Sequence, residues 1–149
     1  MGLFGRILAA TDFSPASAPA IEEAMRLASA TGAELVLVHA YEPPAPAAFE
    51  GYVAPPSVYD EWEDALKTST ESSLELLAAK AREKGIRTRT RVLRGTPYTA
   101  ITEAAAEERA DLVVVGTHGR GGFSRFVLGS VAGRVVASAP CPVLTIRAG

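Results

Sequence analysis

Apolar runs alternate along this chain with segments of helical period. Four short runs rich in Val, Leu and Ile predict strands at 6–12, 34–40, 111–117 and 142–147, and a fifth run, at 86–93, predicts a strand of a different kind. Four segments between them predict helices, at 14–32, 59–85, 96–110 and 129–139. Regular alternation with continuous apolar strands is typical of a parallel sheet covered by helices on both faces. We therefore expect a doubly wound, Rossmann-like α/β fold that binds ligands beyond the carboxyl ends of its strands.

The first two helices carry signals for their ends and their inward faces. Ser14 can cap the first helix, Pro15 suits its first position and Gly32 suits its end. Residues 41–57 hold five of the ten prolines and predict a long loop. In the second helix, the inward candidates are Trp62, Leu66, Leu74, Leu77 and Ala81.

The run at 86–93 differs from the other strands because apolar or Thr positions alternate with Arg87, Arg89 and Arg91. Such alternation is typical of a half-exposed strand, and charge at a sheet edge discourages pairing with other chains. An anion-binding patch is the alternative for these three arginines.

Composition limits the classes of protein to which the chain can belong. Its 149 residues suit one domain, 1–149, and the net charge of −2 gives no reason to expect nucleic-acid or membrane partners. No apolar run approaches the roughly 20 residues of a membrane span, and the amino terminus lacks a signal-peptide layout. The single cysteine, Cys141, excludes an intramolecular disulfide and reads as a small core residue. We expect a cytoplasmic protein.

Residues 116–130 are unusually rich in glycine and directly follow the fourth predicted strand. The glycines are Gly116, Gly119, Gly121, Gly122 and Gly129. They end at the start of a helix, where unpaired N–H groups and the helix dipole favour an anion such as phosphate. Glycine also lets successive N–H groups turn inward around an anion, and Ser130 can add a hydroxyl. The alternative is a flexible connection with a Gly-Ser cap.

Two common phosphate motifs do not fit the chain. It contains no G-x-x-x-x-G-K-[ST] segment, so the Walker A lysine is missing. The first strand is followed by "AATDFSP", without glycine, and "GRGGFS" ends in Ser where the dinucleotide fingerprint needs Gly. NAD binding is therefore disfavoured.

The spacing Gly116-x2-Gly119-x9-Gly129-Ser130 resembles the pattern of the ATP-binding members of the universal stress protein family. The segments "ILAATDFSPAS", "ELVLVHA" and "APCPVLTIR" resemble the opening, second and closing strands of that family. The resemblance covers essentially the whole chain and is weakest across the proline-rich loop. It implies a five-stranded parallel sheet of strand order 3-2-1-4-5, which puts the arginine-bearing run at a margin of the sheet.

The resemblance also implies a nucleotide site where strands one and four end side by side. Thr11 and Asp12 end strand one, and Gly116 would lie along the ribose. A carboxylate repels a triphosphate, so Asp12 is expected at the nucleoside end. There, the resemblance implies that it holds adenine together with the backbone near Val38 and Ala40. The alternative for Asp12 is a helix cap shared with Ser14.

At the phosphate end, the resemblance implies contacts from Gly119, Gly129, Ser130 and Val131. Arg120 is expected to contact phosphate as well, and Arg125 either does so or faces solvent. The expected cofactor is ATP, with Mg²⁺ bound through its phosphates left open. His39 and His118 are candidate general bases by residue type. We assign no catalytic residue and no metal ligand.

These features favour a cytoplasmic stress-response protein that acts as an ATP-dependent binding or regulatory module. The alternative is a slow ATP hydrolase or phosphotransferase that uses the same pocket, since phosphoryl transfer is mostly positioning and charge stabilisation. Without a Walker lysine or an obvious water-orienting residue, we expect at most slow turnover. A family member that binds no nucleotide is disfavoured by the intact glycine spacing.

The last predicted strand suggests a homodimer. Val143, Leu144 and Ile146 make it apolar up to Arg147. An apolar edge invites a second strand, and a two-fold axis would pair it with its own copy. The resemblance implies the same interface. The alternative is that Leu3 and Phe4 of the same chain cover this edge.

Overall fold

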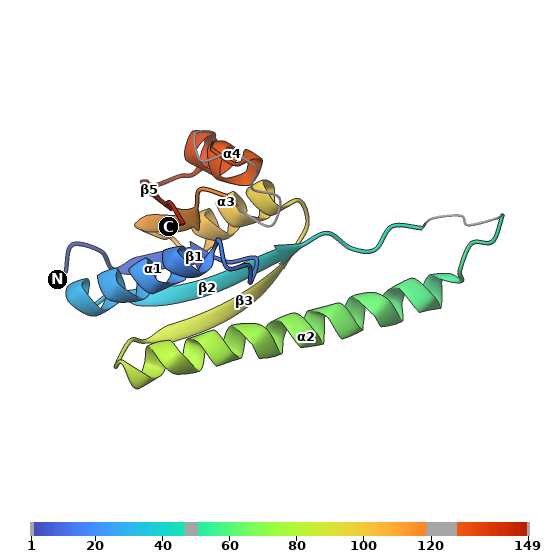
Figure 1. Cartoon of the computed structure of the whole chain (residues 1–149), viewed down its shortest axis with the longest axis horizontal. Helices are drawn as coiled ribbons and strands as arrows, with labels where there is room; N and C mark the ends of the chain where they lie inside the picture. Colours follow the sequence, from blue (N-terminus) through green and yellow to red (C-terminus); the bar gives the residue numbers. More distant parts are fainter. Residues whose placement is uncertain (1, 47–50, 119–127, 149) are drawn as a thin grey trace.

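The structure, a computed structural model, describes residues 2–46, 51–118 and 128–148. Strands and helices alternate within these ranges as β1 (Arg6–Ala10), α1 (Ala18–Thr31), β2 (Glu34–Tyr41), α2 (Pro56–Glu83), β3 (Thr88–Arg94), α3 (Pro97–Glu107), β4 (Leu112–Gly116), α4 (Ser130–Ser138) and β5 (Val143–Ile146). All the strands pair in parallel, in the order β3-β2-β1-β4-β5 (Figure 1). The predicted fold class and strand order are confirmed.

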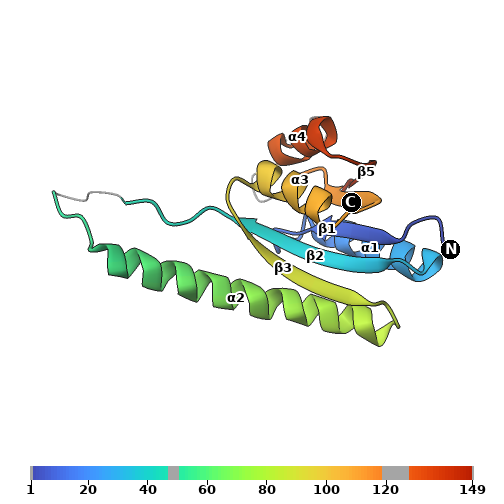
Figure 2. The same cartoon turned by 180° about the vertical axis from the view of Figure 1, so that it is seen from behind.

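Helices cover both faces of the sheet, as successive strand residues point to opposite sides. On one face, Ile7 and Ala9 of β1 share an apolar cluster with buried residues of α1 and α2. On the other face, Leu8 shares a cluster with buried residues of α3 and α4. Figure 2 shows the sheet between these layers from behind. Because both faces are covered, the strands read in sequence as continuous apolar runs.

The start of α1 differs from the prediction. The helix begins at Ala18 after Ser17, so Ser14 is not its N-cap and Pro15 lies before it. Ser14 instead belongs to a turn, in which the Ser17 N–H donates to the Ser14 carbonyl at 3.1 Å. The predicted end is confirmed, since Gly32 adopts a left-handed φ of 73° and its N–H donates to the Ala28 carbonyl.

The inward face of α2 was predicted correctly only in its carboxyl-terminal half. Leu74 and Ala81 are buried, whereas Trp62 is 55% exposed and Leu66 is 39% exposed. The prediction was wrong for those two because α2 extends past the edge of the sheet, as the green helix in Figure 1 shows. Helical periodicity in the sequence indicates which face of a helix is apolar. It does not indicate where along the helix the sheet that packs against that face ends.

β3 lies at a margin of the sheet, as predicted, and its arginines bind carboxylates of the same chain. Arg89 contacts Glu34 at 2.7 Å and Glu108 at 2.5 Å, and Arg91 contacts Glu107 at 2.8 Å and Glu108 at 3.1 Å. The hydrogen bond from Arg89 is the main reason why the pKa of Glu108 is lowered. The edge-strand interpretation therefore fits better than an anion-binding patch.

No helix in the parts of the chain that the structure describes is long and apolar enough to cross a membrane.

Candidate functional site

The turn between β1 and α1 is held by hydrogen bonds that centre on Thr11, which is only 6% exposed. The Thr11 N–H donates to the Val38 carbonyl at 3.0 Å, and the Thr11 hydroxyl accepts from the Phe13 N–H at 2.9 Å. The hydroxyls of Thr11 and Ser17 lie 3.1 Å apart. Phe13 adopts a φ of 62°, which is rare for a bulky residue. Such strain is concentrated at functional sites, so the turn is a candidate binding element.

Asp12 lies at the carboxyl edge of the sheet, where its Oδ1 accepts from the Ser14 N–H at 2.9 Å and from the Ser14 hydroxyl at 2.5 Å. These two bonds close a local turn around the carboxylate. They agree in part with the capping alternative, since Ser14 is the partner, but α1 begins only at Ala18. The same bonds orient the carboxylate, which a binding role also requires.

β2 contributes a backbone edge beside this turn. The backbone of β2 bonds alternately to its two neighbours, so Glu34 donates toward β1 at Gly5 and Leu35 donates toward β3 at Arg87. By this alternation Val38 and Ala40 face β1. The Val38 carbonyl is already bonded to Thr11, and Ala40 lies one step further along, where β1 has ended. The Ala40 N–H and carbonyl therefore lie beyond the end of β1 on the side of β2 that faces it.

His39, on β2, contacts the same β1–α1 turn. Its Nδ1 lies 2.7 Å from the Thr11 carbonyl, and a carbonyl can only accept, so Nδ1 carries the hydrogen. Its ring also contacts the Phe13 ring at 4.9 Å between centroids. The sequence singled out His39 only as a candidate base, and nothing in the pattern signalled this structural role or the contribution of Ser17.

The end of β4 packs directly against the β1–α1 turn. A Cβ on Gly116 would lie 3.3 Å from the Ala16 carbonyl oxygen and 3.5 Å from the Ser17 Cα. The absence of a side chain at Gly116 therefore allows the two strand ends to approach each other. This contact links Gly116 to the β1–α1 turn through Ser17, whose hydroxyl lies 3.1 Å from that of Thr11.

The start of α4 also needs glycine for close approach. The Gly129 N–H donates to the Thr117 carbonyl at 2.7 Å, and a Cβ on Gly129 would lie 2.7 Å from the same oxygen. Gly129 was predicted to contact phosphate, but its N–H already donates to a carbonyl of the same chain. Ser130 and Val131 follow in the first turn of the helix, where N–H groups lack partners within the helix. Of the residues predicted to bind phosphate, Ser130 and Val131 are the ones whose N–H groups lie at the start of α4.

Gly119, Arg120 and Arg125 lie outside the described residues. Next to them, His118 is close to the Thr117 hydroxyl through Nδ1, at 3.1 Å. Its Nε2 is buried and has no hydrogen-bond partner within the described ranges. Those ranges also contain no group of three or more His, Cys, Asp or Glu side chains that could hold a metal ion.

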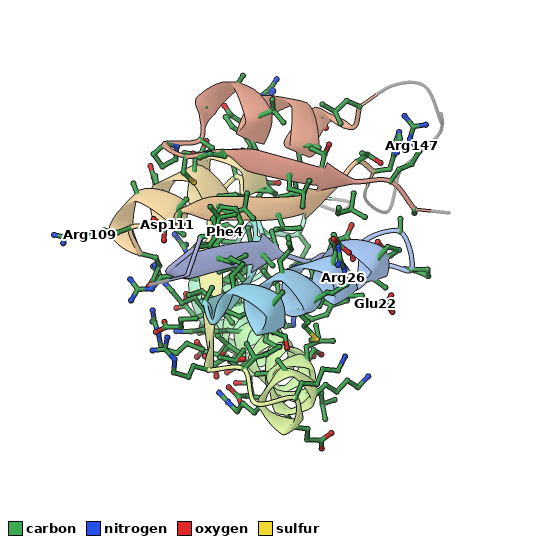
Figure 3. All side chains as sticks on the ribbon, turned by 90° about the vertical axis from the view of Figure 1, so that its left-hand side faces the viewer. Phe4, Glu22, Arg26, Arg109, Asp111 and Arg147 are labelled. Atoms are coloured by element: carbon green, nitrogen blue, oxygen red, sulfur yellow. The ribbon has the colours of Figure 1, made fainter. Side chains whose placement is uncertain are left out.

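At the opposite end of the strands, where β1 and β4 begin, a side chain of the same chain binds the backbone N–H groups. The Asp111 carboxylate accepts from the N–H groups of Gly5 and Arg6 at 2.8 and 2.9 Å. Figure 3 labels Asp111 at this end and Arg147, which follows β5, at the other. Cys141 is half-buried, and burial raises the pKa of its thiol, as expected for a core residue. Because Asp111 already binds the backbone at the amino ends of the strands, the candidate site lies at their carboxyl ends.

Known proteins match this chain over nearly its full length. The model of the universal stress protein family matches residues 3–147. A relative from Thermus aquaticus, described as a universal stress protein in the QAH/OAS sulfhydrylase 3′ region, is 40% identical over 146 residues, which cover 97% of this chain and 100% of the relative. The structure of the universal stress protein UspA from Lactobacillus plantarum aligns with a TM-score of 0.81 at 26% identity, over 96% of this chain and 97% of that one. A universal stress protein crystallised in complex with cAMP aligns with a TM-score of 0.69 at 26% identity, over 98% of both chains.

Proposed function

Since the chain belongs to the universal stress protein family, we propose that it binds ATP at the carboxyl edge of β1, β2 and β4. In this proposal the nucleotide switches a regulatory module of the stress response in the cytoplasm. One observation carries the proposal. The strand order brings the Thr11–Asp12 turn, the Ala40 backbone and the start of α4 to one edge, with glycine where the backbone approaches most closely. A structural neighbour crystallised with cAMP, also an adenine nucleotide, supports it.

The nucleoside end is assigned to Asp12 and the backbone at Val38 and Ala40. The Asp12 carboxylate accepts hydrogen bonds from an amino or hydroxyl group of the nucleoside. Ala40 offers one N–H and one carbonyl side by side, which suits the adenine edge with its ring acceptor and exocyclic amino group. Thr11 positions this edge through its bond to Val38, and Gly116 leaves room for the ribose.

The phosphate end is assigned to the N–H groups of Ser130 and Val131 and to the Ser130 hydroxyl, with Gly119 and Arg120 completing the set. The positive end of the α4 dipole adds to the attraction. Gly129 acts by allowing α4 to lie against Thr117 and not by donating its own N–H. Any Mg²⁺ would be held through the phosphates.

The experiment that tests the proposal compares ATP and GTP binding by calorimetry in wild type and two variants. Asp12→Ala removes the carboxylate and should weaken ATP binding about tenfold, or 1.4 kcal/mol, with less preference over GTP. Ser14→Ala is the matched control, because it breaks the same turn but keeps the carboxylate. Equal ATP affinity in wild type and Asp12→Ala would contradict the assignment, and mass spectrometry of ligand released from purified protein identifies the natural nucleotide.

Turnover is proposed to be slow or absent. The sequence has no G-x-x-x-x-G-K-[ST] segment and so lacks the Walker A lysine that assists phosphoryl transfer in many ATP hydrolases. We expect phosphate release far below the roughly 10 per second of a median enzyme. Release at that rate, lost in Gly119→Val, would place the protein among ATP hydrolases instead.

We further propose a homodimer through β5. This strand is at the margin opposite β3, and its residues Val143, Leu144 and Ile146 are half-exposed. Of the two residues that the alternative placed over this edge, Leu3 is 81% exposed, whereas Phe4 is half-buried against the apolar cluster that Leu144 and Ile146 also border. Antiparallel pairing of two β5 strands would continue the sheet across a two-fold axis.

A further inference from the structure

One face of α2 carries large apolar side chains towards both ends and small serines in the middle, and it is solvent-exposed except at the half-buried Ser73. We define the outer stripe of α2 as Trp62, Leu66, Ser69, Ser73, Leu76 and Lys80. At 3.6 residues per turn, these positions lie within roughly 40° of one line along the helix. Trp62 is 55% exposed and Leu76 is 70% exposed. The residues that bury α2 on the sheet, such as Thr70 and Leu74, lie roughly a third of a turn away, so the stripe is additional to the face that packs on the core.

We infer that the outer stripe is an interface with α2 of a second copy of this chain, with the two helices antiparallel about a two-fold axis. The stripe is complementary to itself in that orientation. With the axis level with residue 71, Leu66 meets the partner's Leu76 and Ser69 meets the partner's Ser73. Each contact recurs by symmetry, as a two-fold interface requires. The small serine side chains at the crossing allow the two helices to approach closely.

The ends of the stripe pair a ring with a cation. In the same register, Trp62 meets the partner's Lys80, and the indole is the most favourable ring for a cation–π pair. An indole buries on the order of 150–250 Å² when covered, so the two tryptophans supply much of the apolar contact. Both positions are exposed in the single chain.

The charges of α2 select the antiparallel orientation. Its first turns, residues 56–66, carry Asp60, Glu61, Glu63 and Asp64 and no basic residue, and its last turn carries Lys80 and Arg82 beside Glu83, with Lys84 at the C-cap. Antiparallel pairing places the acidic segment of each helix beside the basic end of the other. Parallel pairing would place like charges together. Glu63 already binds Arg94, and Arg82 already binds Glu75, so the complementarity is between segments rather than between fixed ion pairs.

The geometry of the fold leaves this face available. α2 has 28 residues, or about 42 Å of helix, and its amino-terminal part projects beyond the sheet (Figure 1). It packs against β3, at the margin opposite β5. Association through α2 is therefore independent of the proposed β5 pairing, and one chain can use both.

Sedimentation velocity and tryptophan emission test the inference, with all variants built on Leu144→Lys so that β5 pairing does not contribute. Trp62 is the only tryptophan in the chain and reports directly on the stripe. Leu76→Lys introduces a charge opposite the partner's Leu66. Glu71→Lys is the matched control, because it places the same residue near the crossing but on the opposite side of the helix.

We expect the Leu144→Lys protein to dimerise at micromolar concentration, with Trp62 emission shifting to shorter wavelength as dimers form. Leu76→Lys should raise the dissociation constant at least about tenfold and abolish the shift, while Glu71→Lys retains both. A Leu144→Lys protein that stays monomeric with solvent-exposed Trp62 emission would overturn the inference. So would dimerisation that Leu76→Lys leaves unchanged.

Discussion

Gly129 shows how one residue of a recognised pattern can serve the fold directly. Sequence spacing identifies Gly129 as a phosphate ligand, yet its N–H donates to the Thr117 carbonyl, and its missing Cβ would lie 2.7 Å from that oxygen. Its φ of −58° is ordinary, so the requirement for glycine comes from close approach and not from backbone torsion. A sequence pattern cannot distinguish a glycine that binds phosphate from a glycine that close packing requires, since the residue is the same in both cases.

Gly129→Ala should therefore destabilise the protein even without nucleotide. The added methyl group must push α4 away from Thr117, and overpacking of this kind costs about 1–3 kcal/mol. Gly133→Ala is the matched control, because its Cβ would meet only a Leu128 methyl group at 3.8 Å. Alanine inside a helix is favoured over glycine by roughly 0.5–1 kcal/mol, so the control should melt at or above the wild-type temperature. Equal melting temperatures of the two variants would refute the close-approach account.

Substitutions at Ser130 test whether the start of α4 binds phosphate, and they avoid the clash that a side chain at Gly129 would cause. It is the first helical residue of α4, where proline is tolerated because the N–H has no partner within the helix. Ser130→Pro removes the N–H and the hydroxyl, and Ser130→Ala removes only the hydroxyl. We expect ATP affinity to fall about tenfold in the first variant and less in the second, with melting temperatures near wild type. Unchanged affinity in Ser130→Pro would exclude α4 as a phosphate ligand.

At the scale of elements, an ion-pair network joins β2 and β3 to the end of α3. Arg89 links Glu34 of β2 to Glu108, and Arg91 links β3 to Glu108 as well. The side chain of Glu108 is only 12% exposed, and the hydrogen bond from Arg89 is foremost in lowering its pKa. A lowered carboxyl pKa adds stability above the pKa of the unfolded chain, and this stability is lost as pH falls through the folded value.

Glu108→Gln should accordingly lower the melting temperature at pH 7, and its effect should shrink in acid as the pH falls through the lowered pKa of the folded wild-type carboxyl. The expected cost at neutral pH is on the order of 1 kcal/mol, because Arg89 is half-exposed and solvent screens the pair. Glu103→Gln, on the exposed side of α3, is the control. Thermal melts at a series of pH values measure the effect, and a pH-independent difference would rule out the ion pairs as its cause.

The elements also show where prediction from sequence stops. Every strand and helix within the described residues was predicted, since apolar period and glycine or proline signals are local. The start of α1 was misplaced because Asp12 and Ser14 bond to each other in a turn, which competes with capping. Trp62 and Leu66 were misassigned because the length of the sheet is a property of the fold and not of α2. Likewise, the aromatic contact of Phe13 with His39 depends on strand order.

On the scale of the whole molecule, the two margins of the sheet are built differently. β3 is flanked by α2 and carries arginines bound to carboxylates, whereas β5 presents half-exposed apolar residues. Charge at one edge discourages strand pairing, and its absence at the other permits it. The proposed β5 dimer would bury the second edge.

In a Leu76→Lys background, in which the outer stripe of α2 does not pair, Leu144→Lys should abolish that dimer, because it places an ammonium group in the middle of an apolar edge. Light scattering at micromolar concentration measures the mass, and Arg147→Ala, which lies beyond the strand, should leave the dimer intact. A Leu76→Lys protein that is monomeric would contradict the proposal, and a Leu76→Lys/Leu144→Lys variant with the same mass as Leu76→Lys would move the interface elsewhere.

The central claim, an adenine nucleotide bound where β1, β2 and β4 end, is tested most directly by NMR. At 15.6 kDa the chain suits a backbone-amide titration with ATP. We predict that the largest shifts fall on Asp12, Ala40, Gly116, Ser130 and Val131, and that Arg87–Arg91 and the amino ends of the strands stay unchanged. Shifts confined to the β3 margin, or none at all at millimolar ATP, would contradict the account.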